Sequence, residues 1–228
     1  MQPYLFPYIG YFQLISIVDK FVIHEDIQYI KGGWINRNRI LFNKKPRYIV
    51  LPISKDSSKL NINKRCFTPE FEINKKKILR QIEAAYGKAP YFKAVYNLIE
   101  KCFQCSNRNV SHFITNCLKE CCNYLKIETE FVISSNLNLN NQLKGQERVI
   151  EITKLLGATR YLNPPGGIEL YNKDEFERNN IKLNFLRCHN ISYHQFNNNY
   201  IPKLSVIDVM MFNDNENINN FMNQFEIV

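Results

Sequence analysis

Glycine is scarce in this chain of 228 residues, with 8 in all, and no apolar run approaches the length of about 20 residues that a membrane-spanning helix needs. The first residues carry no basic leader ahead of an apolar stretch, so we expect no signal peptide and a cytoplasmic protein. Like charges do not gather in blocks of roughly five or more, which argues against the charged tails typical of disordered interaction segments.

What the chain does contain is a large apolar and aromatic fraction, 45% and 13% of its residues. That composition is typical of a globular protein, and a chain of this length buries roughly 70% of the surface that its unfolded form exposes. We therefore expect one domain over residues 1–228. The net charge of +9 comes from short scattered basic groups, which indicate solvated faces. The alternative is a surface that attracts phosphate-bearing ligands.

Cysteine occurs seven times, an odd number, and a reducing compartment would keep the thiols free. Five of the cysteines cluster, at Cys102, Cys105, Cys117, Cys121 and Cys122. Their two closely spaced groups are compatible with zinc, but both fall in segments with helical apolar periodicity. We interpret them as small buried side chains of helices and expect no metal site.

The apolar periodicity predicts an α/β fold. Residues 8–19 follow a helical pattern and lead directly into the apolar run 21–23, which is typical of a buried parallel strand. Other extended segments are predicted over residues 34–42, 48–53, 130–134, 159–162 and 181–186, a helix over 144–156, and a short helix capped by Asp174. Three helices in succession indicate a helical insert over about residues 72–126. The predicted architecture is a mostly parallel sheet flanked by helices, with that insert.

The first candidate motif covers residues 2–13, where two prolines stiffen an aromatic-rich loop that leads into a helix. Backbone N–H groups at such a helix start suit anions, and Gln2, Tyr8 and Tyr11 are its candidate ligand-binding residues. The alternative is an aromatic turn packed in the core. The layout is similar to the first loop of nucleotidyltransferases, but the paired histidines of that loop are absent, so adenylyl transfer by that route is not expected.

The second motif is the polar segment 24–29, which directly follows the predicted strand 20–24. Carboxylates at the carboxyl end of a parallel strand lie where α/β folds bind ligands. Burial there tunes an acid or base toward neutrality, which makes Asp26 a candidate catalytic residue and Gln28 a candidate ligand contact. The alternative is an acid that only caps a turn or helix.

The third motif is the segment 34–40. If it is extended, Trp34, Asn36 and Asn38 share one face, and Arg37 and Arg39 share the other. Amides buried without partners are costly, so a polar group should meet them. A sugar stacked on the indole and bonded by the amides fits, with the two guanidinium groups on a diphosphate. The alternative is an exposed edge strand.

The fourth motif pairs Lys144 with Arg148, which lie one turn apart near a predicted helix start. Positively charged side chains are repelled by the positive end of the helix dipole, and a bound anion would offset that repulsion. Ser134 and Ser135, which precede this helix, are candidate hydroxyl donors. The alternative is a solvated surface pair.

The fifth motif is the turn at residues 163–167, a weak signal by itself. Its candidate residues are Asn163, Gly166, Gly167 and the nearby Tyr171. The glycine pair permits close approach of the backbone to a ligand.

The chain resembles the WbqC-like family. The resemblance is carried by residues 1–15, 19–23, 28–29, 34–40, 157–159, 166–167, 170–171 and 204–208, and so spans nearly the whole chain. Members occur among genes for bacterial surface polysaccharides. Family members usually begin several residues earlier, with an apolar first strand that runs into Met1 and Gln2, so the resemblance implies that the first strand of this chain is truncated or wrongly started. His24 stands where the family pattern has tyrosine, which favours Asp26 over His24 as a base.

The resemblance implies transfer of an acyl group, glycyl among the aminoacyl groups, to the amine of a nucleotide-linked amino-deoxy sugar. Asp26 is the expected base, and Gln2 is placed with it in the catalytic set. The acyl donor is left open between an aminoacyl adenylate, a thioester on a carrier protein and an aminoacyl-tRNA, and no cofactor is identified. One alternative is a non-catalytic protein that binds the sugar nucleotide or a partner enzyme. The other is RNA binding, prompted by the net charge.

Overall fold

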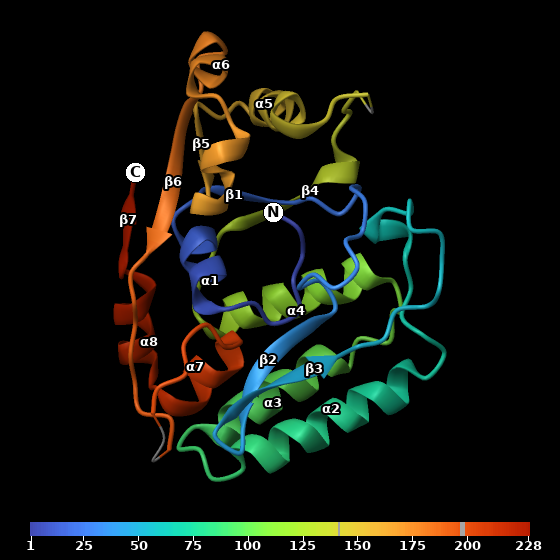
Figure 1. Ribbon diagram of the computed structural model, residues 1–228, viewed down its shortest axis with the longest axis vertical. Coiled ribbons are helices and arrows are strands. Elements are labelled where there is room, and N and C mark those ends of the chain that lie inside the picture. The colour runs from blue at the N-terminus through green and yellow to red at the C-terminus, as the bar shows by residue number, and fades with distance from the viewer. Residues whose placement is uncertain (141, 197–198) are drawn as a thin grey trace.

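The computed structural model describes residues 1–140, 142–196 and 199–228 of the chain (Figure 1). Its helices and strands follow in the order α1 (Ile9–Ser16), β1 (Lys20–Ile23), β2 (Arg37–Phe42), β3 (Lys45–Val50), η1 (Ile62–Lys64), α2 (Phe71–Tyr86), α3 (Phe92–Phe103), α4 (Val110–Tyr124), β4 (Glu130–Ile133), η2 (Ser134–Asn136), α5 (Gly145–Leu155), β5 (Arg160–Asn163), η3 (Pro165–Leu170), α6 (Lys173–Arg178), β6 (Lys182–Cys188), α7 (Val206–Phe212), α8 (Asn215–Met222) and β7 (Phe225–Ile227). Within the described ranges, no helix combines the length and the apolar character needed to cross a membrane.

The α/β class is confirmed. Strand β1 pairs in parallel with β4, from Lys20 opposite Glu130 to Ile23 opposite Ile133. Strand β5 likewise pairs in parallel with β6, and β7 adds to β6 in the antiparallel direction. The parallel strands β1, β4 and β5 are short, with four residues each, and β1 and β4 carry the apolar runs that the sequence pattern indicated.

The strands are distributed over three small sheets: β1–β4, β2–β3 and β5–β6–β7. The β2–β3 sheet is an antiparallel hairpin whose turn residues Asn43 and Lys44 both have positive φ. Two such residues give a turn whose twist matches the flanking strands. These two strands are antiparallel because a two-residue turn leaves no room for the crossover connection that parallel strands need.

A cavity of about 730 Å³ separates β1 from β5, and residues of both strands line it. Met1 lies at its edge, where the terminal amine donates to the Val22 oxygen at 2.7 Å and the Met1 oxygen accepts from the His24 N–H at 2.8 Å. These two bonds are the pattern of a residue paired in parallel with Ile23. The backbone at Met1 therefore already has the position and direction of a strand beside β1.

Helices α2, α3 and α4 pack against one another, as expected for the helical insert, and lie together at one side of the molecule (Figure 1). Their buried side chains belong to the same apolar core as those of α1 and β1. Four cysteines of the cluster lie inside this core, at Cys102, Cys117, Cys121 and Cys122. The division of the chain into domains stays a prediction.

Two local expectations are wrong. Residues 34–36 form a bend, so the strand of the third motif begins only at Arg37. The short helix α6 is capped by Asn172, whose side chain accepts from the Asp174 N–H, and not by Asp174. An Asn at this position competes well with Asp because both side chains accept the same backbone bond.

Candidate functional site

The strongest polar cluster lies at the carboxyl ends of β1 and β4. Strand β1 ends at Ile23 and β4 at Ile133, so the loops after them meet. Asp26 comes from the first loop, and its Oδ1 accepts a short hydrogen bond from the Ser134 hydroxyl in the second. The Asn61 side chain donates to the Asp26 main-chain oxygen at 2.9 Å and fixes the loop. The parallel pairing thus places Asp26 at the carboxyl end of a parallel strand, as the second motif indicated, and its role toward a ligand stays a prediction.

Arg148 completes this cluster from the first turns of α5. Its Nη2 lies 2.5 Å from Asp26 Oδ2, and both side chains are mostly shielded from solvent. The Arg148 Nε is buried and has no hydrogen-bond partner among the described residues. A buried donor without a partner is costly, so this nitrogen is available to an anionic or carbonyl oxygen of a ligand.

Glu25 lies beside this cluster and is 3% exposed. Its Oε1 accepts from the Ser135 N–H at 3.0 Å, and its main-chain N–H contacts the Ser134 oxygen at 3.4 Å. The sequence interpretation named Ser134 only as a hydroxyl donor beside Ser135, and it gave Glu25 no role of its own within the second motif. Their positions next to Asp26 and Ser135, directly after two apolar runs, are the signal that would have found them.

His24 is the first residue after β1, and its imidazole is neutral. Burial lowers the pKa of His24 to about 2, with the Met1 ammonium and Arg148 adding in the same direction. Burial also lowers the pKa of the Met1 amine to about 5. The cluster therefore combines an ion pair with groups that are held uncharged.

The loop of residues 2–7 is held by side chains of the same segment and of β2. The Tyr11 hydroxyl donates to the Gln2 main-chain oxygen at 2.7 Å, which places Tyr11 in the core. Tyr8 stays partly exposed and folds over Gly10, where a Cβ would stand 2.4 Å from its ring. Burial is the main reason that the pKa of Tyr8 rises to about 12. Of these two tyrosines, Tyr11 fits the alternative of an aromatic turn packed in the core, and Tyr8 faces outward.

The amides of the third motif have protein partners. Asn38 is buried and donates to the main-chain oxygens of Leu5 and Phe6, at 3.0 and 2.8 Å. Asn36 donates to the Leu51 oxygen at 2.8 Å and accepts from the Tyr29 hydroxyl. The expectation that polar groups meet these amides is correct. Main-chain oxygens are among those polar groups.

Trp34 lies with the arginines and not with the amides, because the bend at residues 34–36 turns it away. The Arg39 guanidinium lies 5.5 Å from the centre of the exposed Trp34 ring, and that of Arg37 lies 4.9 Å from the Tyr48 ring. Arg39 Nε is buried without a partner among the described residues. The prediction that Trp34 shares one strand face with Asn36 and Asn38 is therefore wrong. Trp34 lies instead on a cationic and aromatic surface with the arginines.

The remaining candidates are spread over the surface. Lys144 is the exposed residue before α5, whereas Arg148 is buried, so the two do not share one environment. Gln28 is exposed and donates to the Ser58 oxygen at 3.1 Å. Ser135 contributes its N–H to Glu25, and its exposed side chain is beside the cluster.

The turn at residues 163–167 begins where β5 ends. Asn163 packs against Gly167 so closely that a Cβ there would lie 2.2 Å from the Asn163 amide nitrogen. Gly167 is thus required by the protein's own packing, while Gly166 faces open space. Tyr171 packs against Tyr161 and Phe176 in a separate apolar cluster with residues of β6. A ligand role for these residues stays a prediction.

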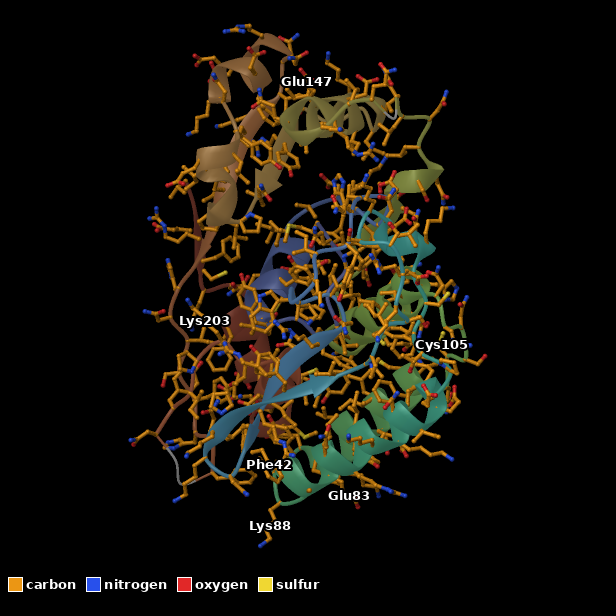
Figure 2. The ribbon with its side chains drawn as sticks, turned by 45° about the vertical axis from the view of Figure 1, so that its right-hand side comes forward. Phe42, Glu83, Lys88, Cys105, Glu147 and Lys203 are labelled. Carbon is orange, nitrogen blue, oxygen red and sulfur yellow. The ribbon has the colours of Figure 1, made fainter. Side chains whose placement is uncertain are left out.

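A second cavity, of about 340 Å³, lies between Glu25 and the first half of α4. It was not expected from the sequence, because its residues come from four separate segments. Among the described residues, no group of three or more His, Cys, Asp or Glu side chains is placed to hold a metal ion. Figure 2 shows Glu147 of α5 at one end of the molecule and Phe42, at the tip of the β2–β3 hairpin, toward the other.

The fold and the cluster define an α/β protein with a buried acid–arginine site at the carboxyl ends of parallel strands. The family model of the WbqC-like protein family matches residues 2–220, and the chain belongs to that family. The chain is also 26% identical over 212 residues to "Uncharacterized protein Rv1507c" of Mycobacterium tuberculosis (strain ATCC 25618 / H37Rv), covering 92% of this chain and 90% of that protein. No solved structure matches the chain.

Proposed function

We propose that the protein transfers an acyl group, glycyl among the aminoacyl groups, to the amine of a nucleotide-linked amino-deoxy sugar in bacterial surface polysaccharide biosynthesis. The observation that carries this proposal is the Asp26–Arg148 ion pair, with Ser134 on the second carboxylate oxygen. It combines a carboxylate that can take a proton with a guanidinium that can meet developing negative charge.

The reaction needs a proton removed before a bond forms. The sugar amine is an ammonium near pH 7, and the Asp26 carboxylate takes one proton from it. The neutral nitrogen then attacks the acyl carbonyl, the carbonyl oxygen becomes negative, and the unpartnered Arg148 Nε donates to it. Collapse expels the donor's leaving group and re-forms the carbonyl, and loss of the second amine proton yields the amide. Positioning of the two reactants contributes up to roughly 7–11 kcal/mol.

Binding of the sugar nucleotide is assigned to the loop 2–13 and to the surface of Trp34, Arg37 and Arg39. Trp34 offers an exposed ring, and Tyr8 a second one, for stacking. The unpartnered Arg39 Nε supports a phosphate contact. Gln2 and Asn36 are assigned to the sugar hydroxyls through the capacity that their protein bonds leave free, and Asn38, whose two N–H donors bond to Leu5 and Phe6, is assigned to holding the loop that carries Gln2. The donor stays open between an aminoacyl adenylate, a thioester and an aminoacyl-tRNA.

The test uses Asp26→Asn, with Asp56→Asn in an exposed loop as the control. Each variant is incubated with amino-sugar nucleotides and each donor class, and amide formation is read by mass spectrometry. We expect Asp26→Asn to lose at least a hundredfold in rate while it still binds the sugar nucleotide. Unchanged turnover in Asp26→Asn would remove the base from the proposal.

One observation favours a non-catalytic binding protein as the second candidate. Both carboxylate oxygens of Asp26 already have partners, so the arrangement is also that of a structural ion pair. That function predicts equal affinity of the Asp26→Asn and wild-type chains for the sugar nucleotide and no amide from any donor. Mass spectrometry of surface polysaccharide from cells lacking the gene separates the two in the organism, because an amide-linked substituent disappears directly only if the missing protein is the enzyme that attaches it.

A further inference from the structure

The cavity between Glu25 and α4 is lined by an unusual set of oxygens. It measures about 340 Å³, which is within the size range of small-ligand pockets. Its inner wall carries Glu25 and Thr115, which are 3% and 7% exposed, together with the half-buried Asn63. His112 and Lys119 line it as well, and both are exposed to solvent. The wall is therefore rich in acceptors, and Lys119 is an exposed cation among the lining residues.

Glu25 has no cation to balance it. Its Oε1 accepts from the Ser135 N–H, but no basic side chain in the described ranges lies within 4.0 Å of its carboxylate. Arg148, the arginine of the neighbouring cluster, is engaged by Asp26. A buried carboxylate without a paired cation is strongly unfavourable, so a positive group from outside the chain would stabilise it.

Two further oxygens of the same wall have no partner among the described residues. Asn63 Oδ1 and Thr115 Oγ1 are both buried and unbonded. The Asn63 amide oxygen only accepts, and the Asn63 main chain is held in place by the Asn109 side chain, which donates to its carbonyl at 2.7 Å. Asn109 in turn caps α4 by accepting from the His112 N–H, so the helix and the loop are fixed to each other.

We propose that this cavity binds a primary ammonium group, with its three N–H donors directed at Glu25, Asn63 and Thr115. A primary ammonium supplies one positive charge and three donors, which matches one unbalanced carboxylate and the unpaired oxygens. The exposed Lys119 fits a ligand whose other end is anionic, such as a carboxylate or phosphate. The inference goes beyond the proposed function, because Asp26 is not among the residues that line this cavity, so the ammonium bound here is a different group from the amine that Asp26 deprotonates.

The first test compares ligands that differ only in their N–H donors. Ethanolamine and choline form one such pair, and glycine and its trimethylated form betaine another. Each is titrated into the full chain at pH 7 without any acyl donor, and binding is followed by ¹⁵N NMR shifts of the Thr115 and Ser135 amides. We expect the primary ammonium of each pair to bind at least tenfold more tightly than its quaternary partner. Equal affinities within both pairs, or no shift with either primary amine, would overturn the proposal.

The second test uses variants that remove one acceptor. Glu25→Gln keeps the shape and the bond from Ser135, and Thr115→Val removes only a hydroxyl. We expect ethanolamine affinity to fall at least tenfold in the first and about threefold or more in the second. Thr153→Val is the matched control, because Thr153 is a buried threonine of α5 whose hydroxyl bonds to the Val149 oxygen outside the cavity. Loss of affinity in the control equal to that in Thr115→Val would contradict the assignment.

A measurement without ligand separates a binding role of Glu25 from a structural one. If the Glu25 carboxylate is unpaired until a ligand cation binds, Glu25→Gln unfolds at the same temperature as the wild-type chain or at a higher one. If its charge stabilises the loop of Ser135, the variant unfolds at a lower temperature, and the proposal fails. Ethanolamine binding combined with absence of amide formation would leave this site intact and reject the reaction proposed above.

Discussion

Arg148 Nη2 and Asp26 Oδ2 lie 2.5 Å apart, although the two residues are separated by 122 positions in the chain. This ion pair joins the first turns of α5 to the loop after β1. Because Ser134 bonds to the other oxygen of Asp26, the pair also connects to the end of β4. Three segments that carry the candidate chemistry therefore converge on one carboxylate.

Breaking this pair from one side should destabilise the fold. Arg148→Met keeps the aliphatic length but leaves the Asp26 carboxylate shielded without a counter-charge, and we expect a loss of about 3 kcal/mol in the free energy of unfolding. Urea denaturation at pH 7 measures it. The double variant Asp26→Asn/Arg148→Met is the control and should recover at least half of that loss. A double variant no more stable than Arg148→Met would show that the pair contributes no coupling.

Asn38 should matter for stability whether or not it contacts a ligand. Asn38→Asp keeps the size but replaces the amide that donates to Leu5 and Phe6 by acceptor oxygens. The two carbonyls then lose their donor beside a buried negative charge, so we expect the free energy of unfolding to fall by about 2–3 kcal/mol. The control is Asn107→Asp, where the exposed side chain only accepts a bond and keeps it. A urea midpoint of Asn38→Asp equal to that of the control would refute the structural role.

His24 should make the protein less stable in mild acid. Its pKa is lowered from 6.5 to about 2, mainly by burial, so the folded state stays neutral while the unfolded state takes up a proton below about pH 6.5. The contribution is therefore complete above pH 6.5 and is lost as pH falls, by roughly 1.4 kcal/mol per pH unit.

The measurement compares unfolding free energies of the wild-type chain and His24→Gln at intervals from pH 7 to pH 4. We expect the free energy of unfolding of His24→Gln to decline less steeply as pH falls, by about the slope that the uptake of one proton contributes. Gln104→Asn is the control, because that exposed side chain does not titrate and should leave the slope unchanged. Parallel curves for the wild-type chain and His24→Gln would show that His24 titrates alike in both states.

The cavity between β1 and β5 should accept an added strand. An extension of five alternating lysine and valine or isoleucine residues, fused ahead of Met1, continues the parallel pairing with β1 and replaces a buried terminal amine by a peptide N–H. Two or three buried β-branched side chains should raise the free energy of unfolding by about 2 kcal/mol or more, which corresponds to roughly 4–8 °C in Tm. A glycine–serine extension of equal length is the control. Equal Tm values for the two extended chains would contradict the prediction.

Local pattern was sufficient for much of the fold. The helices near residues 8–19, 72–126 and 144–156 and the strands 20–24 and 130–134 were predictable because apolar spacing and caps act over a few residues. The same pattern was not sufficient at residues 34–36, where Trp34 bends away from the strand. It also could not divide the strands into three sheets, since pairing partners are set by contacts distant in sequence.

By itself, the sequence determined the α/β class, the family and the prediction that Asp26 follows a buried strand, because each depends on residues near one another in the chain. Only the tertiary structure decided that Arg148 binds Asp26, that main-chain oxygens hold Asn38, and that Glu25 faces an acceptor-lined cavity with Thr115. The physical reason is that burial and the partner of a polar group are properties of the packed chain. A side chain's type limits which bonds it can make, and the fold selects the atom that completes them.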